Sequence, residues 1–171
     1  MTYDLDAVPC ATVWSTLQVM ITMLNVRFLT VGIVWGETIM KGGYAGKILR
    51  VNLTDKSIGT IDTAQYEEYG GGHGIGSATF WDLAGNQLPF SALDPRNVVT
   101  IMAGPFSGVV VPAAVGRCEV QWLGPQAYPI EWFTRSNFGG RFSTQLKYAG
   151  WDGIVIEGAS EEPVWINIVD N

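Results

Sequence analysis

The chain has 171 residues, of which 47% are hydrophobic and only 15% are charged, and it is long enough for one domain with a hydrophobic core. Its net charge of −6 and its lack of a basic stripe argue against a nucleic-acid-binding protein. Its two cysteines, Cys10 and Cys118, cannot build a disulfide framework, and they are too few to ligate an iron–sulfur cluster, which takes about four thiolates. We therefore expect a cytoplasmic protein in a reducing compartment.

The first forty residues differ in character from the rest of the chain. Residues 11–35 are largely apolar, but Arg27 interrupts them, and an arginine inside a membrane-spanning helix is energetically costly. Acidic residues precede this run, where a signal peptide would carry positive charge. We expect Met40 to begin the functional domain, over 40–171, and residues 1–39 to be an upstream extension or hydrophobic segment. A membrane anchor and a divergent structured extension are the alternatives.

Strand and turn signals dominate from Met40 onward. Asp62 or Thr63 can cap a short acidic helix, and the glycine run that follows it is expected to form a flexible junction between helices. Strands outnumber helices, so we expect an α+β fold built on a mainly antiparallel β-sheet scaffold with a few short helices. In chain order, the sequence predicts a hairpin of strands over 47–53 and 57–62, the acidic helix to 68, a helix over 75–83, strands over 98–103, 108–114 and 117–123, a loop over 124–129, a short helix that ends at Gly150, and strands over 153–158 and 162–169.

Residues 137–152 predict a glycine turn that opens a short helix. Asn137, Gly139 and Gly140 let the backbone bend and approach a ligand closely. Apolar residues then recur at helical spacing until Gly150, which is typical of a helix C-cap. The free N–H groups of the first helical turn would favour an anion, so the segment can hold a phosphate.

No residue has the pattern of a catalytic group. His73 is the single histidine and lies in the glycine run, where a solvated or hydrogen-bonded histidine is more common than a catalytic one. Glu67 and Glu68 are adjacent and would face different sides of a helix, which argues against a paired-carboxylate site. Gly70–Gly76 does not have the G-x-G-x-x-G spacing of a dinucleotide-binding turn.

Several blocks nevertheless follow one another at a recognisable spacing. In chain order they are Gly46–Thr54, Tyr69–Gly74, Ala103–Gly108, Gly116–Arg117, Gly139–Gly140 and Lys147–Asp152. Together they resemble the N-terminal domain of the tungsten-containing aldehyde:ferredoxin oxidoreductases over roughly residues 42–171. The resemblance implies a partial N-terminal domain of that fold.

The resemblance also implies a cofactor site. In this family the N-terminal domain is the base on which a tungsten or molybdenum bis-pterin rests, and an arginine and an asparagine contact the pterin phosphates and a bridging Mg²⁺. The matching residues are Arg117 and Asn137, followed by Phe138, Gly139 and Gly140, with Asn137 as the candidate Mg²⁺ ligand. Phe138 departs from the small residue that is usual there. Without the resemblance, Arg117 could equally be a structural arginine and Asn137 a turn asparagine.

The family reaction oxidises an aldehyde with water to a carboxylic acid and passes two electrons through a [4Fe–4S] cluster to ferredoxin. This chain holds no cluster ligands and no evident catalytic residue, so the resemblance implies that both lie in remaining domains or a complementary subunit. We expect an N-terminal fragment or split subunit that is inactive alone. The alternatives are a non-catalytic remnant that acts as a protein-interaction domain, and a membrane-tethered piece that uses residues 11–35.

Overall fold

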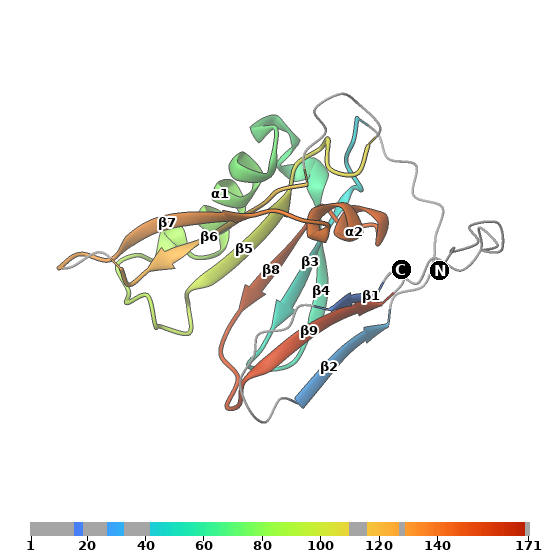
Figure 1. The fold of residues 1–171 in the computed structure, drawn as a ribbon. Helices are drawn as coiled ribbons and strands as arrows, with labels where there is room; N and C mark the ends of the chain where they lie inside the picture. The colour runs from blue at the N-terminus through green and yellow to red at the C-terminus, as the bar shows by residue number, and fades with distance from the viewer. Residues whose placement is uncertain (1–15, 19–26, 33–41, 110–115, 127–128, 170–171) are drawn as a thin grey trace, which may run out of the picture.

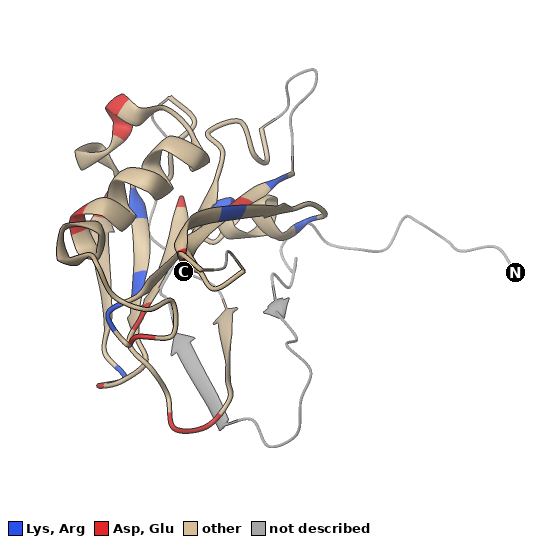
Figure 2. Ribbon diagram, turned by 90° about the vertical axis from the view of Figure 1, so that its left-hand side faces the viewer, with Lys and Arg blue, Asp and Glu red and all other residues tan. Residues whose placement is uncertain are grey.

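Two β-sheets and two α-helices form the part of the chain that the computed structural model describes, which is residues 16–18, 27–32, 42–109, 116–126 and 129–169 (Figure 1). Short 3₁₀ turns and loops connect these elements. The predicted α+β class is confirmed. Among the described residues, the acidic positions are spread over several of the elements and loops (Figure 2).

The larger sheet contains six strands in the order β4-β3-β8-β5-β6-β7. Every neighbouring pair is antiparallel except β3 and β8, which run parallel, so the expectation of a mainly antiparallel scaffold is confirmed. The strands are β3 (Lys47–Asn52), β4 (Ile58–Asp62), β5 (Val98–Ala103), β6 (Cys118–Gly124), β7 (Trp132–Phe138) and β8 (Gly153–Glu157). β7 is an edge strand, and this edge positions the candidate site.

The smaller sheet has the order β1-β9-β2. β9 (Val164–Val169) pairs antiparallel with β1 (Thr16–Gln18) and parallel with β2 (Arg27–Gly32). Ile168 of β9 is buried in the same apolar cluster as Leu49 of β3, so the two sheets share a core.

β1 and β2 lie within the apolar run that was considered as a membrane anchor. Most of residues 1–39 lie outside the described residues, and the domain boundary at Met40 stays a prediction. Among the residues that the structure describes, no helix is long and apolar enough to cross a membrane.

Each face of the larger sheet is covered by a helix. Ile48 and Leu49 are neighbours on β3 but belong to two different buried clusters, because successive side chains of a strand point to opposite faces. Ile75 and Phe80 of α1 (Gly72–Leu83) complete one cluster, and Leu146 of α2 (Phe142–Tyr148) belongs to the other. Figure 1 shows the two helices packed against the sheet in this way.

Helix α1 begins earlier than the sequence predicts. The glycine run is not a flexible junction, because Gly72 and Gly74 are already helical. An added Cβ at Gly72 would lie 3.0 Å from the carbonyl oxygen of Met102, and one at Gly76 would lie 2.3 Å from Oε1 of Gln121. The glycines therefore let α1 pack closely on β5 and β6, and this packing overrides their low helix propensity.

Other local predictions are confirmed or corrected by the backbone. The hairpin of β3 and β4 forms as expected, and Asp62 accepts a hydrogen bond from the N–H of Ala64, as a capping residue does. The acidic helix is instead two 3₁₀ turns, Thr63–Gln65 and Glu67–Tyr69. Of the strand predicted over 108–114, positions 108 and 109 lie in a turn, and the rest lies outside the described residues.

Strand β7 is absent from the sequence prediction. The structure places Asn137 and Phe138 at the end of this strand, where a glycine turn was expected, and the turn begins only at Gly139. β7 lies at the edge of the sheet and is exposed along most of its length, so its sequence lacks the alternation of apolar and polar residues that reveals a half-buried strand.

Candidate functional site

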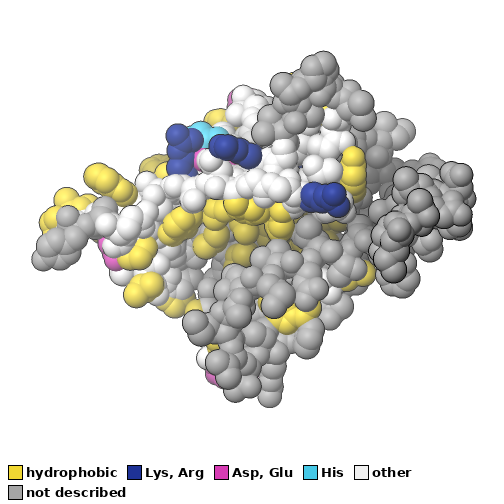
Figure 3. All heavy atoms as spheres, in the orientation of Figure 1, with side chains coloured by type: hydrophobic (Ala, Val, Ile, Leu, Met, Phe, Trp, Pro, Cys, Tyr) yellow, Lys and Arg dark blue, Asp and Glu magenta, His cyan; other side chains and the backbone are white. Residues whose placement is uncertain are grey.

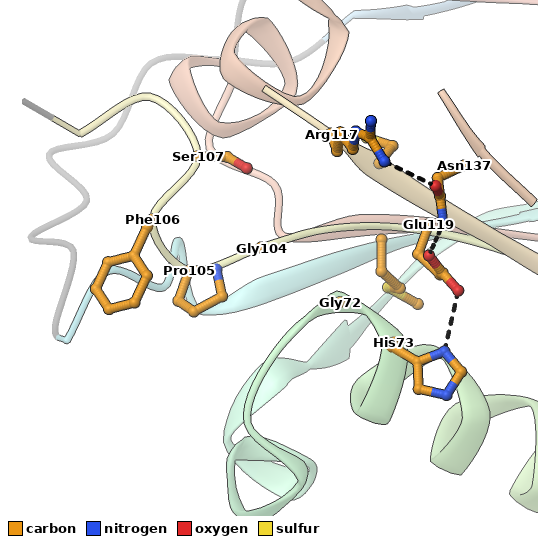
Figure 4. A pocket seen from close by; sticks show the side chains of 11 residues that line it. Gly72, His73, Gly104, Pro105, Phe106, Ser107, Arg117, Glu119 and Asn137 are labelled. Carbon is orange, nitrogen blue, oxygen red and sulfur yellow. Dashed lines mark hydrogen bonds and ion pairs between the residues drawn. The ribbon is translucent and has the colours of Figure 1, made fainter. Parts of the chain in front are cut away.

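A hollow of about 290 Å³ opens where the start of α1 meets the edge of the larger sheet (Figure 4). Its walls come from α1, the loop after β5, the start of β6 and the end of β7. The lining residues with polar or charged side chains are His73, Ser107, Arg117, Glu119 and Asn137. Elements distant in sequence thus bring donors and an acceptor to one place.

The register of β6 and β7 arranges these side chains. Glu119 lies directly opposite Asn137, and Gln121 lies opposite Arg135. Because side chains alternate along a strand, these four residues share one face of the sheet. It is the face that α1 covers, since His73 of α1 contacts both Glu119 and Gln121.

Glu119 is the centre of this polar cluster. Its Oε2 accepts a hydrogen bond from Nδ2 of Asn137 at 2.6 Å, and its Oε1 accepts one from Nη1 of Arg135 at 3.3 Å. Oε1 also lies 3.0 Å from Nδ1 of His73, a ring nitrogen that is 2.7 Å from Nε2 of Gln121. Burial raises the pKa of the Glu119 carboxyl, but the hydrogen bonds from Asn137, His73 and Arg135 outweigh it, so the pKa is lowered overall. The carboxylate is therefore ionised at neutral pH.

Arg117 and Asn137 lie side by side at this edge. Nη1 of Arg117 donates a hydrogen bond to Oδ1 of Asn137 at 3.3 Å. Both side chains are exposed, and Arg117 directly precedes β6 while Asn137 is near the end of β7. The two residues named from the sequence are thus brought together, although they are twenty positions apart.

The remaining predicted residues lie next to this pair. The ring of Phe138 packs edge-on against Phe142 of α2, with 4.9 Å between ring centroids, so it anchors the helix. Gly139 and Gly140 are exposed, and an added Cβ at either would meet nothing within 4 Å. Gly140 has a φ of +93°, a conformation that favours glycine. Gly116 packs against this turn, because an added Cβ at Gly116 would lie only 2.5 Å from the carbonyl oxygen of Gly140.

His73 is hydrogen-bonded, as the sequence prediction favoured, and its side chain is 55% exposed. The amide of Gln121 donates to the carbonyl oxygen of His73 at 3.0 Å and to the hydroxyl of Ser77 at 3.1 Å. Sequence reasoning missed Glu119 and Gln121 as members of the cluster. The signal that could have found them is the period of two that starts at Arg117 and continues along β6.

A buried ion pair supports the loop after β5, which forms one wall of the hollow. Lys147 pairs with Asp152 and also donates to the carbonyl oxygen of Gly43 at 2.6 Å. Gly43 has a φ of +88°, and an added Cβ there would lie 2.6 Å from the carbonyl oxygen of Pro105, which lines the hollow. The ion pair therefore positions the segment that supports this wall.

Basic side chains gather beside the histidine on this face of the molecule (Figure 3). Arg117 and Arg135 lie at the polar cluster, and the exposed Arg141 follows the glycine turn. Glu119 is the one acidic residue that lines the hollow. Within the described part of the chain, no group of three or more histidine, cysteine, aspartate or glutamate side chains could hold a metal ion. The three arginines outnumber the Glu119 carboxylate at this edge of the sheet, so the edge carries a net positive charge.

Comparison with known proteins identifies the family of the chain. Residues 48–171 match the family model described as "Aldehyde ferredoxin oxidoreductase, N-terminal domain". The chain belongs to this family. The chain is 39% identical over 132 residues to a tungsten-containing aldehyde ferredoxin oxidoreductase of Thermococcus kodakarensis, and 37% identical over 134 residues to one of Pyrococcus abyssi. Each match covers 75% of this chain.

The chain is also similar to part of a solved structure. The fold is similar to a chain of the active-site complex BamBC of benzoyl coenzyme A reductase in complex with 1,5 dienoyl-CoA, with a TM-score of 0.62 and 30% sequence identity. This match covers 70% of this chain and 18% of the other chain. The chain also spans only about a fifth of the length of the curated relatives it matches, 21% and 20%.

Proposed function

We propose that this chain is the cofactor-binding base of an oxidoreductase, and that the edge of its larger sheet holds the phosphates of a tungsten or molybdenum bis-pterin. The observation that carries the proposal is the pairing of Arg117 with Asn137 beside the open backbone of Gly139 and Gly140. The names of the T. kodakarensis and P. abyssi relatives support tungsten as the metal.

The side chains present fit such a group. An arginine offers a planar fork of donors that matches two phosphate oxygens, and Arg117 is exposed at the mouth of the hollow. Oδ1 of Asn137 is an amide oxygen, which is a suitable ligand for a hard cation such as Mg²⁺. The negative charge of Glu119 is met by Arg135 and by hydrogen bonds from His73 and Asn137, so it does not prevent anion binding.

The role of the domain is binding and orientation. When bound, the metal and pterin would supply the acceptor for the two electrons that are released when an aldehyde and water are converted to a carboxylic acid. Arg117 would hold phosphate charge, Asn137 would hold the bridging Mg²⁺, and the turn at Gly139 and Gly140 would let the cofactor approach the backbone. The domain has no acid–base role in this proposal, and alone it would be inactive.

The other parts of the enzyme would come from remaining domains or a complementary subunit. A [4Fe–4S] cluster needs about four thiolates, and this chain has two cysteines. The electrons would pass through that cluster to ferredoxin in the cytoplasm.

A second candidate function is a non-catalytic domain that binds another protein. Several large apolar side chains on the described surface favour it, among them Trp81, Trp132, Ile130 and Phe106, which are 61–69% exposed. The same surface is also expected of a domain that packs against the rest of an enzyme. Metal content distinguishes the two functions, because only the cofactor base contains tungsten or molybdenum with pterin.

Mass spectrometry of the anaerobically purified protein, with its copurifying polypeptides, tests the proposal. A charge-assisted hydrogen bond contributes about 1.5–3 kcal/mol, and about 1.4 kcal/mol corresponds to a tenfold change in affinity. Arg117→Ala should therefore lower cofactor affinity roughly tenfold or more and reduce tungsten and pterin per protein. Arg117→Lys should recover only part, because an ammonium lacks the fork.

Arg96→Ala is the matched control. Arg96 is exposed and pairs with Asp94, away from the hollow. This variant should keep the wild-type metal and pterin content. Unchanged content in Arg117→Ala would refute the phosphate role.

A further inference from the structure

The side-chain amide of Asn137 is held from both sides. Its Oδ1 accepts from Nη1 of Arg117 at 3.3 Å, and its Nδ2 donates to Oε2 of Glu119 at 2.6 Å. Figure 4 shows the three side chains in a row along the edge of the hollow. The amide thus lies between a cation and an anion.

These two neighbours determine which way the amide points. A guanidinium can only donate hydrogen bonds, and an ionised carboxylate can only accept them. If the amide were rotated by 180°, its oxygen would face the Glu119 carboxylate at 2.6 Å and its NH₂ group would face Arg117. Both contacts would then be repulsive, so Oδ1 must face Arg117.

Glu119 is itself fixed. Its side chain is only 12% exposed, and its Oε1 is held by His73 of α1 and by Arg135 of β7. The donors come from a helix and from the neighbouring strand, so the carboxylate cannot rotate away without losing hydrogen bonds on two sides. The position of the Asn137 amide is therefore set by a carboxylate that is anchored independently of it.

We propose that Glu119 is a positioning residue of the phosphate site: it fixes the amide of Asn137 so that the oxygen, and not the NH₂ group, is presented beside Arg117. The site then offers a cation ligand next to a phosphate-binding fork. The proposal rests on the proposed function, because it assigns the amide oxygen to the Mg²⁺ of a magnesium-bound phosphate.

The direction in which phosphate affinity changes when Glu119 is removed distinguishes a positioning role from a purely electrostatic one. If Glu119 acted only through its charge, its removal would take a negative charge away from an anion site and would tighten phosphate binding. If Glu119 positions Asn137, its removal frees the amide to rotate and weakens the binding of a magnesium-bound phosphate. The two roles predict opposite changes in affinity.

The experiment uses the 171-residue chain with Glu119→Gln, which keeps the size of the side chain and removes its charge. The first readout is the side-chain NH₂ resonance of Asn137 in ¹⁵N-labelled protein, assigned by its loss in Asn137→Asp. In the wild type one of these protons should be shifted downfield and protected from exchange. In Glu119→Gln that proton should move upfield and exchange faster, because a neutral acceptor forms a weaker hydrogen bond.

The second readout is the calorimetric affinity for magnesium pyrophosphate. Glu119→Gln should bind roughly tenfold more weakly, as is typical when a residue that orients a metal ligand is lost. Glu157→Gln is the matched control: Glu157 pairs with Arg50 on β3, so its loss removes the same charge away from the hollow. It should leave both readouts unchanged.

Two results overturn the inference, and each is separate from a failure of the proposed function. One is an Asn137 amide resonance that is the same in Glu119→Gln as in the wild type. The other is equal or tighter pyrophosphate binding by Glu119→Gln while Arg117→Ala binds more weakly than the wild type. If the wild type does not bind magnesium pyrophosphate and Arg117→Ala changes nothing, the proposed function fails, and this inference fails with it.

Discussion

The ammonium group of Lys147 and the carboxylate of Asp152 form an ion pair in which both residues are only 2% exposed. The remaining lone pairs of Asp152 accept hydrogen bonds from the backbone N–H groups of Ala45 and Gly46, both at 2.8 Å, and from the hydroxyl of Thr63 at 2.7 Å. One carboxylate therefore ties the segment before β3 to the end of α2 and to the turn after β4. This arrangement satisfies the charge of Asp152 fully.

Breaking this pair on one side should destabilise the domain strongly. Lys147→Met would leave Asp152 as a buried charge without its counter-ion, which typically costs about 3–5 kcal/mol. Urea unfolding followed by tryptophan fluorescence should show the transition at much lower denaturant, with a similar slope.

Arg50→Met is the control for the ion pair. Arg50 pairs with Glu157, but its side chain is 42% exposed, so the loss should be about 1 kcal/mol or less. Equal losses in the Lys147 and Arg50 variants would show that burial of the Lys147 pair does not matter.

Two glycines beside the proposed cofactor site should separate effects on stability from effects on binding. Gly139→Ala places a Cβ where nothing lies within 4 Å, so the free energy of unfolding should change by about 0.5 kcal/mol or less. If the cofactor approaches this backbone closely, the same methyl group should lower the tungsten and pterin content of the purified protein. Full cofactor content would contradict a close approach at Gly139.

Gly116→Ala, unlike Gly139→Ala, should lower the free energy of unfolding. Its Cβ would lie 2.5 Å from the carbonyl oxygen of Gly140, which is backbone and must move. We expect a loss of about 1–3 kcal/mol in the free energy of unfolding, as for other overpacked positions. Urea unfolding of the two variants in parallel makes the comparison.

Local patterns were sufficient to predict much of the fold. β3 and β4 are separated by a turn of polar residues, and β8 is a run of β-branched residues between glycines. α2 ends as predicted, with Gly150 at a φ of +80° and its N–H bonded to the carbonyl of Lys147. In each case the sequence signal arises within a few residues.

The errors arise where tertiary contacts decide the structure. α1 starts at Gly72 because its glycines pack on β5 and β6, a contact that helix propensity cannot reveal. β7 lacks alternation because it is an exposed edge strand. The roles of Glu119 and His73 depend on the register of β7 and on the early start of α1. The family resemblance therefore indicated Arg117 and Asn137 but not Glu119, which lies opposite Asn137.

The exposed apolar surface should make the isolated chain associate. Trp132 is 62% exposed on the edge strand β7, and Ile130, just before that strand, is 69% exposed. Edge strands with apolar side chains are prone to pair with other chains. Size-exclusion chromatography with light scattering should show species larger than a monomer at high concentration, and Trp132→Lys should reduce them. A well-behaved monomer at high concentration would contradict this prediction.

The thiol of Cys118 should make the domain sensitive to alkaline pH. Cys118 is only 1% exposed, and burial raises its pKa from 9.0 to about 12. Between these values the thiol ionises in the unfolded chain but stays protonated in the folded domain. The raised pKa therefore leaves stability intact below pH 9.0 and lowers it as the pH rises toward about 12, by about 1.4 kcal/mol per pH unit.

Urea unfolding at pH 8 to 11 tests this in a Cys10→Ser background, in which Cys118 is the only thiol. Lysines and tyrosines also titrate in this range, so the comparison is with the same chain that carries Cys118→Ala. The Ala variant should be less stable at pH 8, because a buried side chain is truncated. Above pH 9 the free energy of unfolding of the Ala variant should fall less steeply with pH, and the difference in slope should be about 1.4 kcal/mol per pH unit, the contribution of one proton. Parallel curves for the two chains would show that the thiol ionises equally in the folded and unfolded states.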